Sequence, residues 1–166
     1  MRWRRDGFTL IELAVVLLII AACVTVVFPK FSVGFLDRQR LRSSVSRIAS
    51  IAEYAHQRAV CTHVTHLLHF DIEKGEYWVT AQTSDGNVVP IADGLNLKGR
   101  LPEGAQFSGI EFRGTRADLE DVITIEFSPQ GWIEPVTVYI ASSKGRKMSV
   151  VINEMSGNVE TFELPE

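Results

Sequence analysis

The hydrophobic and polar positions of the chain follow three successive patterns. From Phe8 to Phe28 the residues are almost continuously apolar, and Glu12 is the one charged residue among them. Further on, apolar residues recur at steps of three and four, which is the period of one helix face; they are Leu41, Val45, Ile48, Ala52, Ala55 and Ala59. Beyond Thr62 the period becomes two, which is typical of strands with one buried face. These patterns predict one long helix followed by a β-rich region.

The apolar run over 8–28 has the length of a membrane-spanning helix. At about 1.5 Å per residue, a helix over these residues is about 31 Å long, close to the thickness of a hydrocarbon core. Before it stand three arginines and one acid, namely Arg2, Arg4, Arg5 and Asp6. The positive-inside rule therefore predicts a cytoplasmic N-terminus and an extracytoplasmic remainder. The run ends in VVFPKF, a poor site for signal peptidase, so we expect a single-pass anchor that stays attached.

The helix is expected to continue beyond this segment to about Cys61. Pro29 lacks a backbone N–H and predicts a helix kink near the preceding turn. Residues 29–62 form the amphipathic half of the helix. Its apolar stripe is expected to pack against a sheet, because each of the two has one apolar face to bury; the expected packing residues are Leu41, Val45, Ile48 and Ala52.

Residues 63–166 are predicted to form an antiparallel β-rich domain. HLLHFDI and EYWVTAQ flank Glu73-Lys74-Gly75, which predicts a hairpin. Later runs with a period of two predict further strands, separated by turn-rich pieces; they are GIEFRG, VITIEFS, VTVYIAS, MSVVIN and NVETFEL. The stretch from Thr83 to Gly104 is rich in Gly, Asp, Asn and Pro, and predicts a long irregular connection. The predicted fold class is α+β, with a long N-terminal α-helix packed on an antiparallel β-sheet or small β-sandwich.

Composition and charge indicate a folded domain and give no sign of a nucleic-acid-binding or disulfide-bonded protein. The chain has 166 residues, of which 46% are hydrophobic, enough for a core behind the N-terminal run. A formal net charge of -3 gives no reason to expect nucleic acid as a partner. The two cysteines, Cys23 and Cys61, lie in different segments, so both are expected to be free thiols.

Candidate metal and catalytic residues do not form a recognisable site in the sequence. His63, His66 and His69 are three residues apart, so on a strand His66 faces away from the other two. A second candidate is an acidic group without the glycine-bearing spacing of a calcium loop; its members are Asp118, Glu120 and Asp121. There is no nucleophile beside a base, no phosphate loop and no zinc spacing. We therefore expect no enzyme activity, no metal and no cofactor.

Glu12 is the residue of the apolar run that needs an explanation. A carboxylate at the centre of a membrane helix costs about 2.5–3.5 kcal/mol, and less near an interface. No basic residue follows it within the run. Either the acid lies shallow enough to meet headgroup water, or its cation comes from another molecule.

The run RRDGFTLIELAVVLLIIAA resembles the type III signal of type IV pilins and type II secretion pseudopilins. The resemblance implies that a prepilin peptidase removes the leader 1–7 by cleaving between Gly7 and Phe8, and methylates the new N-terminus at Phe8. It also implies that Glu12 is the assembly acid, which pairs with the freed amine of a neighbouring subunit. Such a buried charge pair would favour one assembly register, because an unpaired subunit keeps an uncompensated charge in lipid.

The C-terminal half resembles the GspH/FimT-type minor pseudopilins, whose closing strands carry F-x-x-x-G and G-x-V. The matching residues are Phe127, Gly131, Val150, Val151, Gly157 and Val159. The resemblance implies a type IV pilin-like fold and a structural role in the pseudopilus of a type II secretion system. Its implied partners are other major and minor pseudopilins, the prepilin peptidase, the inner-membrane secretion platform and the lipid bilayer.

A minor type IV pilin of the FimT type, acting in pilus assembly or DNA uptake, is the alternative function. Relatives that take up DNA hold phosphates with arginines near the closing segment. Here the closing segment is acidic, with Glu160, Glu163 and Glu166. The basic cluster Lys144-Gly145-Arg146-Lys147 lies in a predicted turn. Since phosphate binding needs a cationic footprint, no nucleic acid is expected.

Overall fold

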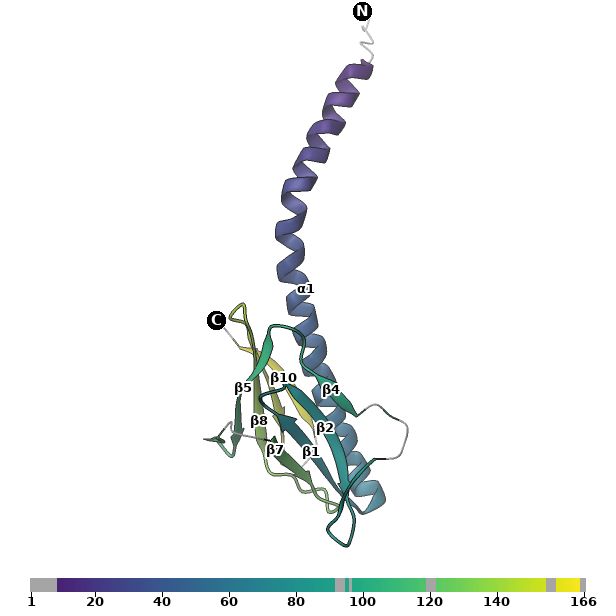
Figure 1. Ribbon diagram of the computed structural model, residues 1–166, viewed down its shortest axis with the longest axis vertical. Coiled ribbons are helices and arrows are strands. Elements are labelled where there is room, and N and C mark those ends of the chain that lie inside the picture. Colours follow the sequence, from purple (N-terminus) through teal and green to yellow (C-terminus); the bar gives the residue numbers. More distant parts are fainter. Residues whose placement is uncertain (1–8, 92–94, 96, 119–121, 155–157, 165–166) are drawn as a thin grey trace, which may run out of the picture. The chain divides into compact units, whose positions relative to one another are not determined.

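The computed structural model describes residues 9–91, 95, 97–118, 122–154 and 158–164 (Figure 1). The side chains of residues 26–36 lie outside this description. The chain divides into two compact units, Met1–Arg38 and Gln39–Glu166. Each unit is described separately below.

The helix α1 (Leu10–Thr62) is assigned without interruption and passes through Pro29. The helix predicted over this region is therefore confirmed, and the kink expected at Pro29 stays a prediction. Where α1 ends, His63 takes a left-handed backbone conformation with φ of 59°, which is a common way for a helix to stop. The Thr62 hydroxyl donates to the carbonyl of Arg58 in the last turn, at 2.7 Å.

The first sheet contains the predicted hairpin. It is built from β1 (Thr65–Asp71), β2 (Glu76–Gln82), β3 (Val88–Pro90), β4 (Lys98–Arg100) and β7 (Val122–Phe127). The strand order is β3-β2-β1-β7, and β4 pairs with the same strand, β2, as β3 does. In the hairpin His69 pairs with Trp78 and Asp71 with Glu76, which confirms the turn predicted at residues 73–75.

The second sheet is formed by the C-terminal strands. Its members are β5 (Ala105–Phe112), β6 (Thr115–Arg116), β8 (Val136–Ser142), β9 (Lys147–Ile152) and β10 (Val159–Leu164). Their order is β10-β9-β8-β5-β6, and every pairing is antiparallel. The register shifts between Phe107 and Gly109, so β5 contains a bulge.

The core of the second unit lies between α1 and the inner faces of both sheets. Phe70 of the first sheet meets Phe107 of the second edge to face, with ring centroids 5.4 Å apart. The predicted helix stripe lies in the same core; Leu41, Val45, Ile48, Ala52, Ala55 and Ala59 all have exposed fractions of 2% or less. Alanines in the last turns let the backbone of α1 come close to the strands. Two packed sheets correspond to the β-sandwich alternative of the predicted fold class.

The prediction of an irregular connection over 83–104 was partly wrong. This stretch contains β3 and β4, which both extend the first sheet along β2. Gly99 of β4 lies opposite Tyr77 and provides no side chain, so the Tyr77 ring occupies the space where a Cβ would be. This strand was not predicted from composition because a glycine in sequence usually indicates a turn. Gly99 instead makes room for a side chain of the neighbouring strand.

Candidate functional site

The N-terminal part of α1 presents apolar side chains to its surroundings on every side. All described side chains from Thr9 to Thr25 are exposed, and among the large hydrophobic ones the exposed fraction is highest at Leu10, 87%, and Ile11, 72%. Glu12 is the one charged residue within 9–25. A continuous apolar surface of this kind is typical of a segment that associates with another molecule or with lipid. We take residues 9–25 as the candidate assembly segment.

Thr9 caps the N-terminus of this segment. The backbone N–H of Glu12 donates to the Thr9 hydroxyl at 3.3 Å and to the Thr9 carbonyl at 3.1 Å. Glu12 lies in the first turn, where a carboxylate is stabilised by the partial positive charge of the helix terminus. Threonine followed three residues later by glutamate, just before an apolar run, is the capping-box pattern. This role of Thr9 was not predicted, although the pattern stands in the sequence as TLIE.

The predicted processing site and membrane span are only partly covered by the structure. Gly7 and Phe8 lie outside the described residues. Within the described residues, no helix is long and apolar enough to cross a bilayer. The predicted span 8–28 includes Phe8 and side chains outside the described residues, and it stays a prediction.

In the described part of the second unit, polar contacts of Arg47 and His56 fasten α1 to the strands and loops around it. Arg47 donates through Nη2 to the carbonyl of Lys98 in β4, at 3.0 Å. His56 Nε2 lies 3.2 Å from the carbonyl oxygen of Gly131, whose φ is 82°. A Cβ on Gly131 would also touch Val60, so this turn approaches α1 closely. The glycine of the F-x-x-x-G pattern therefore lies where the loop after β7 meets the helix.

The other residues of the two closing-strand patterns occupy ordinary structural positions. Phe127 and Val150 are fully buried in the core, and Val151 and Val159 are half-buried on β9 and β10. Gly157 lies outside the described residues. The basic cluster forms the turn between β8 and β9, where Ser142 donates its N–H to the Arg146 carbonyl at 2.8 Å. Lys144 and Lys147 are exposed there.

The histidines are separated by the pleat of β1. His66 is buried and its Nδ1 lies 2.8 Å from the carbonyl oxygen of Val64. His69 is on the opposite face, where its ring stacks on Trp78 and its nitrogens lie 2.9 Å and 2.7 Å from the hydroxyls of Thr124 and Thr80. Burial lowers the pKa of His69 from its ordinary value. Within the described part of the chain, no three His, Cys, Asp or Glu residues gather as metal ligands.

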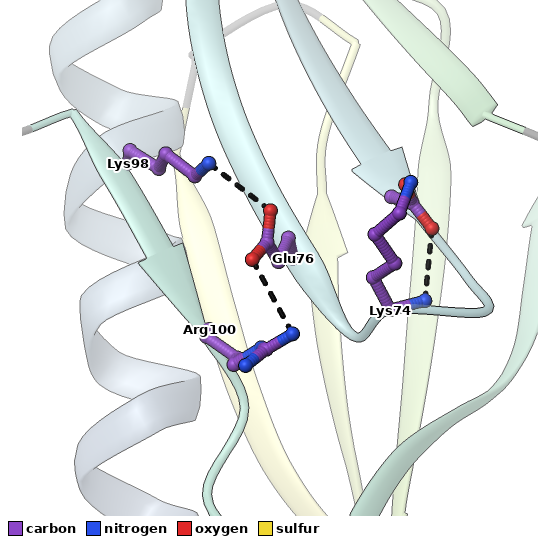
Figure 2. A network of polar contacts seen from close by, with 5 residues as sticks. Lys74, Glu76, Lys98 and Arg100 are labelled. Carbon is purple, nitrogen blue, oxygen red and sulfur yellow. Dashed lines mark hydrogen bonds and ion pairs between the residues drawn. The ribbon is translucent and has the colours of Figure 1, made fainter.

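Ion pairs brace the hairpin and the strand beside it (Figure 2). Glu76 of β2 bridges two cations of β4, with Lys98 Nζ at 3.0 Å and Arg100 Nη2 at 3.5 Å. In the turn, Lys74 Nζ lies 2.7 Å from Oδ2 of Asp71. These carboxylates are bound by neighbouring side chains of the same sheet, so their role is structural.

Comparison with known proteins identifies the N-terminal motif and the fold. Residues 4–28 match the prokaryotic N-terminal methylation motif. Two structures of the minor pseudopilin EpsH from the type 2 secretion system of Vibrio cholerae match with TM-scores of 0.59 and 0.63 at 14% identity. They cover 76% and 77% of this chain, and 99% and 96% of the EpsH chains. The solution structure of GspH from E. coli matches with a TM-score of 0.59 and 14% identity, covering 80% of this chain and 94% of GspH.

No curated protein matches the chain by sequence at a significant level. At 14% identity the structural likeness establishes the fold, and the fold predicted from the resemblance is confirmed. The chain thus combines a prokaryotic N-terminal methylation motif with the type IV pilin-like fold of the minor pseudopilins EpsH and GspH.

Proposed function

We propose that the protein is a minor pseudopilin, a structural subunit of the periplasmic pseudopilus of a type II secretion system that supports export of folded proteins. The observation that carries the proposal is the candidate assembly segment. It combines an exposed apolar surface, one acid in its first turn and the N-terminal methylation motif, and it precedes a pseudopilin fold. The proposed role is structural, with no reaction assigned to the chain.

Processing of the N-terminus would create the positively charged partner that Glu12 lacks within its own segment. A prepilin peptidase would cleave between Gly7 and Phe8 and methylate the amine of Phe8. An amine still carries its positive charge after methylation, so it can pair with a carboxylate. The Glu12 carboxylate of one subunit would pair with the amine of its neighbour, because an unpaired charge in lipid costs about 2.5–3.5 kcal/mol. Assembly in one register would remove this cost for both groups.

The proposed location follows from the same segment. The subunit would insert in the inner membrane through residues 8–28, with its N-terminus cytoplasmic and the β-rich domain periplasmic. Its partners would be other major and minor pseudopilins, the prepilin peptidase, the secretion platform and the bilayer. A role in DNA uptake is disfavoured by the exposed acids Glu160 and Glu163 on the last strand, since phosphate binding needs a cationic surface.

The test compares three variants of the full-length chain in its native cell. Gly7→Val should keep the leader attached. Glu12→Ala should be cleaved normally but should fail to join a filament. Thr25→Ala is the matched control, because Thr25 is another polar residue of the segment and its hydroxyl donates within the helix to the Ala21 carbonyl, at 2.7 Å.

Two readouts separate processing from assembly. The mass of the N-terminal peptide reports cleavage, and copurification with other methylation-motif proteins reports filament incorporation. Normal incorporation of Glu12→Ala would refute the role given to the acid. A normally shortened Gly7→Val product would refute the cleavage site.

A further inference from the structure

The outer face of the second sheet has an aromatic centre. Along β8 and β9, side chains that point into the core alternate with side chains on this face, because successive residues of a strand point to opposite sides. The register defines one cross-strand row on the outer face, which consists of Gly109, Tyr139, Ser149 and Phe162. The row alternates small residues with aromatic rings. Phe162 is 48% exposed, so part of this aromatic surface is in contact with solvent.

The Tyr139 ring is held in position by its own sheet. Its hydroxyl donates to Oε2 of Glu111 at 3.1 Å. A Cβ on Gly109 would lie 3.4 Å from the Tyr139 ring and 3.3 Å from the Arg116 guanidinium, so both groups pack closely over this glycine. Arg116 in turn donates to the Ser108 carbonyl at 2.6 Å. A ring held in this way loses little conformational freedom when a partner packs on it.

Exposed charges of opposite sign lie on either side of the aromatic row. Lys147 is exposed on β9 at one end of the face, and Glu160 is exposed on β10 at the other. Lys147 pairs in register with Leu164, so Lys147 and Glu160 are about 13 Å apart along the strands and do not pair within one chain. Glu163 lies opposite the buried Met148, on the other side of the sheet. The outer face is therefore basic at one end and acidic at the other.

This charge arrangement is complementary to itself. A twofold axis that lies in the plane of the face and runs across the strands reverses the direction of the second copy. The Lys147 end of one copy then meets the Glu160 end of the other, and the same pair forms twice. Twofold contacts of this kind, with the same surface on both subunits, are the commonest in homo-oligomers. An aromatic centre within a polar rim is also the usual composition of a protein–protein interface.

We propose that the outer face of the second sheet is a contact between two copies of this chain, with Lys147 of one copy opposite Glu160 of the other. The contact goes beyond the proposed function, because it concerns the second unit alone and requires neither processing nor a filament. Four strands about 4.8 Å apart and about six residues long give a face of about 19 by 20 Å. Contacts of this small size are transient, so the pair forms and separates reversibly.

Photocrosslinking between two tagged copies detects such a transient pair. A photoreactive phenylalanine analogue replaces Phe162 in the full-length chain, in its native cell, which also makes a copy with a different epitope tag. Val88, on β3 of the first sheet, is the matched control position and is 53% exposed. We expect the crosslink between the two tagged copies to be severalfold stronger from position 162 than from position 88. Equal yields, or adducts at position 162 only with lipid or with other proteins, would overturn the proposal.

Charge reversal tests the arrangement of the two copies. Lys147→Glu and Glu160→Lys should each reduce the crosslink from position 162 severalfold, because like charges then meet at both ends. When one tagged copy carries Lys147→Glu and the other carries Glu160→Lys, opposite charges meet again and the yield should return. Circular dichroism checks that each variant keeps its fold. Unchanged yields in the single variants, or no recovery in the mixed pair, would also overturn the proposal.

The two proposals fail separately. Association through the candidate assembly segment would not respond to charge reversal at Lys147 and Glu160, because neither residue belongs to that segment. Filament incorporation is read from Glu12→Ala. If the unsubstituted chain joins a filament and Glu12→Ala does not, the proposed function stands even when the contact between copies fails its test.

Discussion

Asp71 shows how a single side chain holds the turn between β1 and β2. Its carboxylate accepts the backbone N–H of Lys74 at 2.9 Å and the Lys74 ammonium at 2.7 Å. The side-chain hydrogen bond from Lys74 is the main reason why the pKa of Asp71 is lowered from 3.8. The pKa of Lys74 is raised for the same reason, its hydrogen bond to Asp71. Both shifts favour the charged pair in the folded protein.

The Asp71 pair predicts a loss of stability in acid. Because the folded-state pKa lies below the unfolded value, the contribution of Asp71 is fully present above about pH 4 and is lost as the pH falls through the folded-state pKa. Asp71→Asn should lower the melting temperature at pH 7 and should flatten its decline below pH 4. Thermal melts of the full-length chain in detergent, from pH 7 to pH 2, measure this. Parallel declines in the two proteins would contradict the assignment.

Gly99 is required by the ring that packs over it. Tyr77 is 1% exposed, so its ring has little room to move away from a new Cβ. Overpacking of a core typically costs about 1–3 kcal/mol, and we expect this loss of unfolding free energy for Gly99→Ala. Tyr77→Leu in the same chain should recover part of the loss, because the smaller side chain leaves space for the methyl group. Additive losses in the double variant, measured by denaturant unfolding, would show that the ring is not the cause.

At the scale of elements, α1 begins where Thr9 caps it. The cap satisfies the backbone N–H of Glu12 and fixes the first turn of the helix. The position of Glu12 relative to the N-terminus therefore depends on Thr9. This dependence links local helix geometry to the proposed pairing between subunits.

Removal of the Thr9 hydroxyl should loosen the first turn of α1. Loss of an N-cap costs about 1 kcal/mol, which corresponds to about fivefold faster opening. Thr9→Ala should accordingly speed hydrogen exchange at the amide of Glu12 about fivefold in detergent micelles. Thr9→Ser keeps the acceptor and should exchange like the unsubstituted chain. Equal exchange rates in the alanine and serine variants would exclude the cap as the cause.

At the scale of the whole molecule, the sequence predicted the elements that follow a regular period. The stripe from Leu41 to Ala59 and the hairpin around Glu73-Lys74-Gly75 could be predicted, because local spacing alone decides which face is buried. The assignment of strands to the two sheets and their order could not be predicted, because strand order depends on contacts distant in sequence, such as Phe70 with Phe107. The strand β4 was missed because a glycine usually indicates a turn. Here Gly99 is needed because the ring of Tyr77, in another strand, occupies the space of a Cβ.

The candidate site was predictable to a different extent in each unit. Glu12, the apolar run and the glycine before Phe8 stand in one short segment, so this pattern can be recognised from the sequence alone. A hollow of about 490 Å³ beside β2 has Trp78, Leu95 and Leu97 among its described lining residues, and these come together only when β3 and β4 pair with β2. No local spacing indicates such a site.

The neighbours of this chain in its native cell decide most directly whether it is a subunit of a secretion pseudopilus. Full-length protein is crosslinked in intact cells and purified, and the captured proteins are identified by mass spectrometry together with the mass of its own N-terminal peptide. We expect a chain that begins at methylated Phe8 and is joined to pseudopilins of a type II secretion system. Capture of type IV pilins or DNA-uptake proteins, or of no filament protein at all, would contradict it.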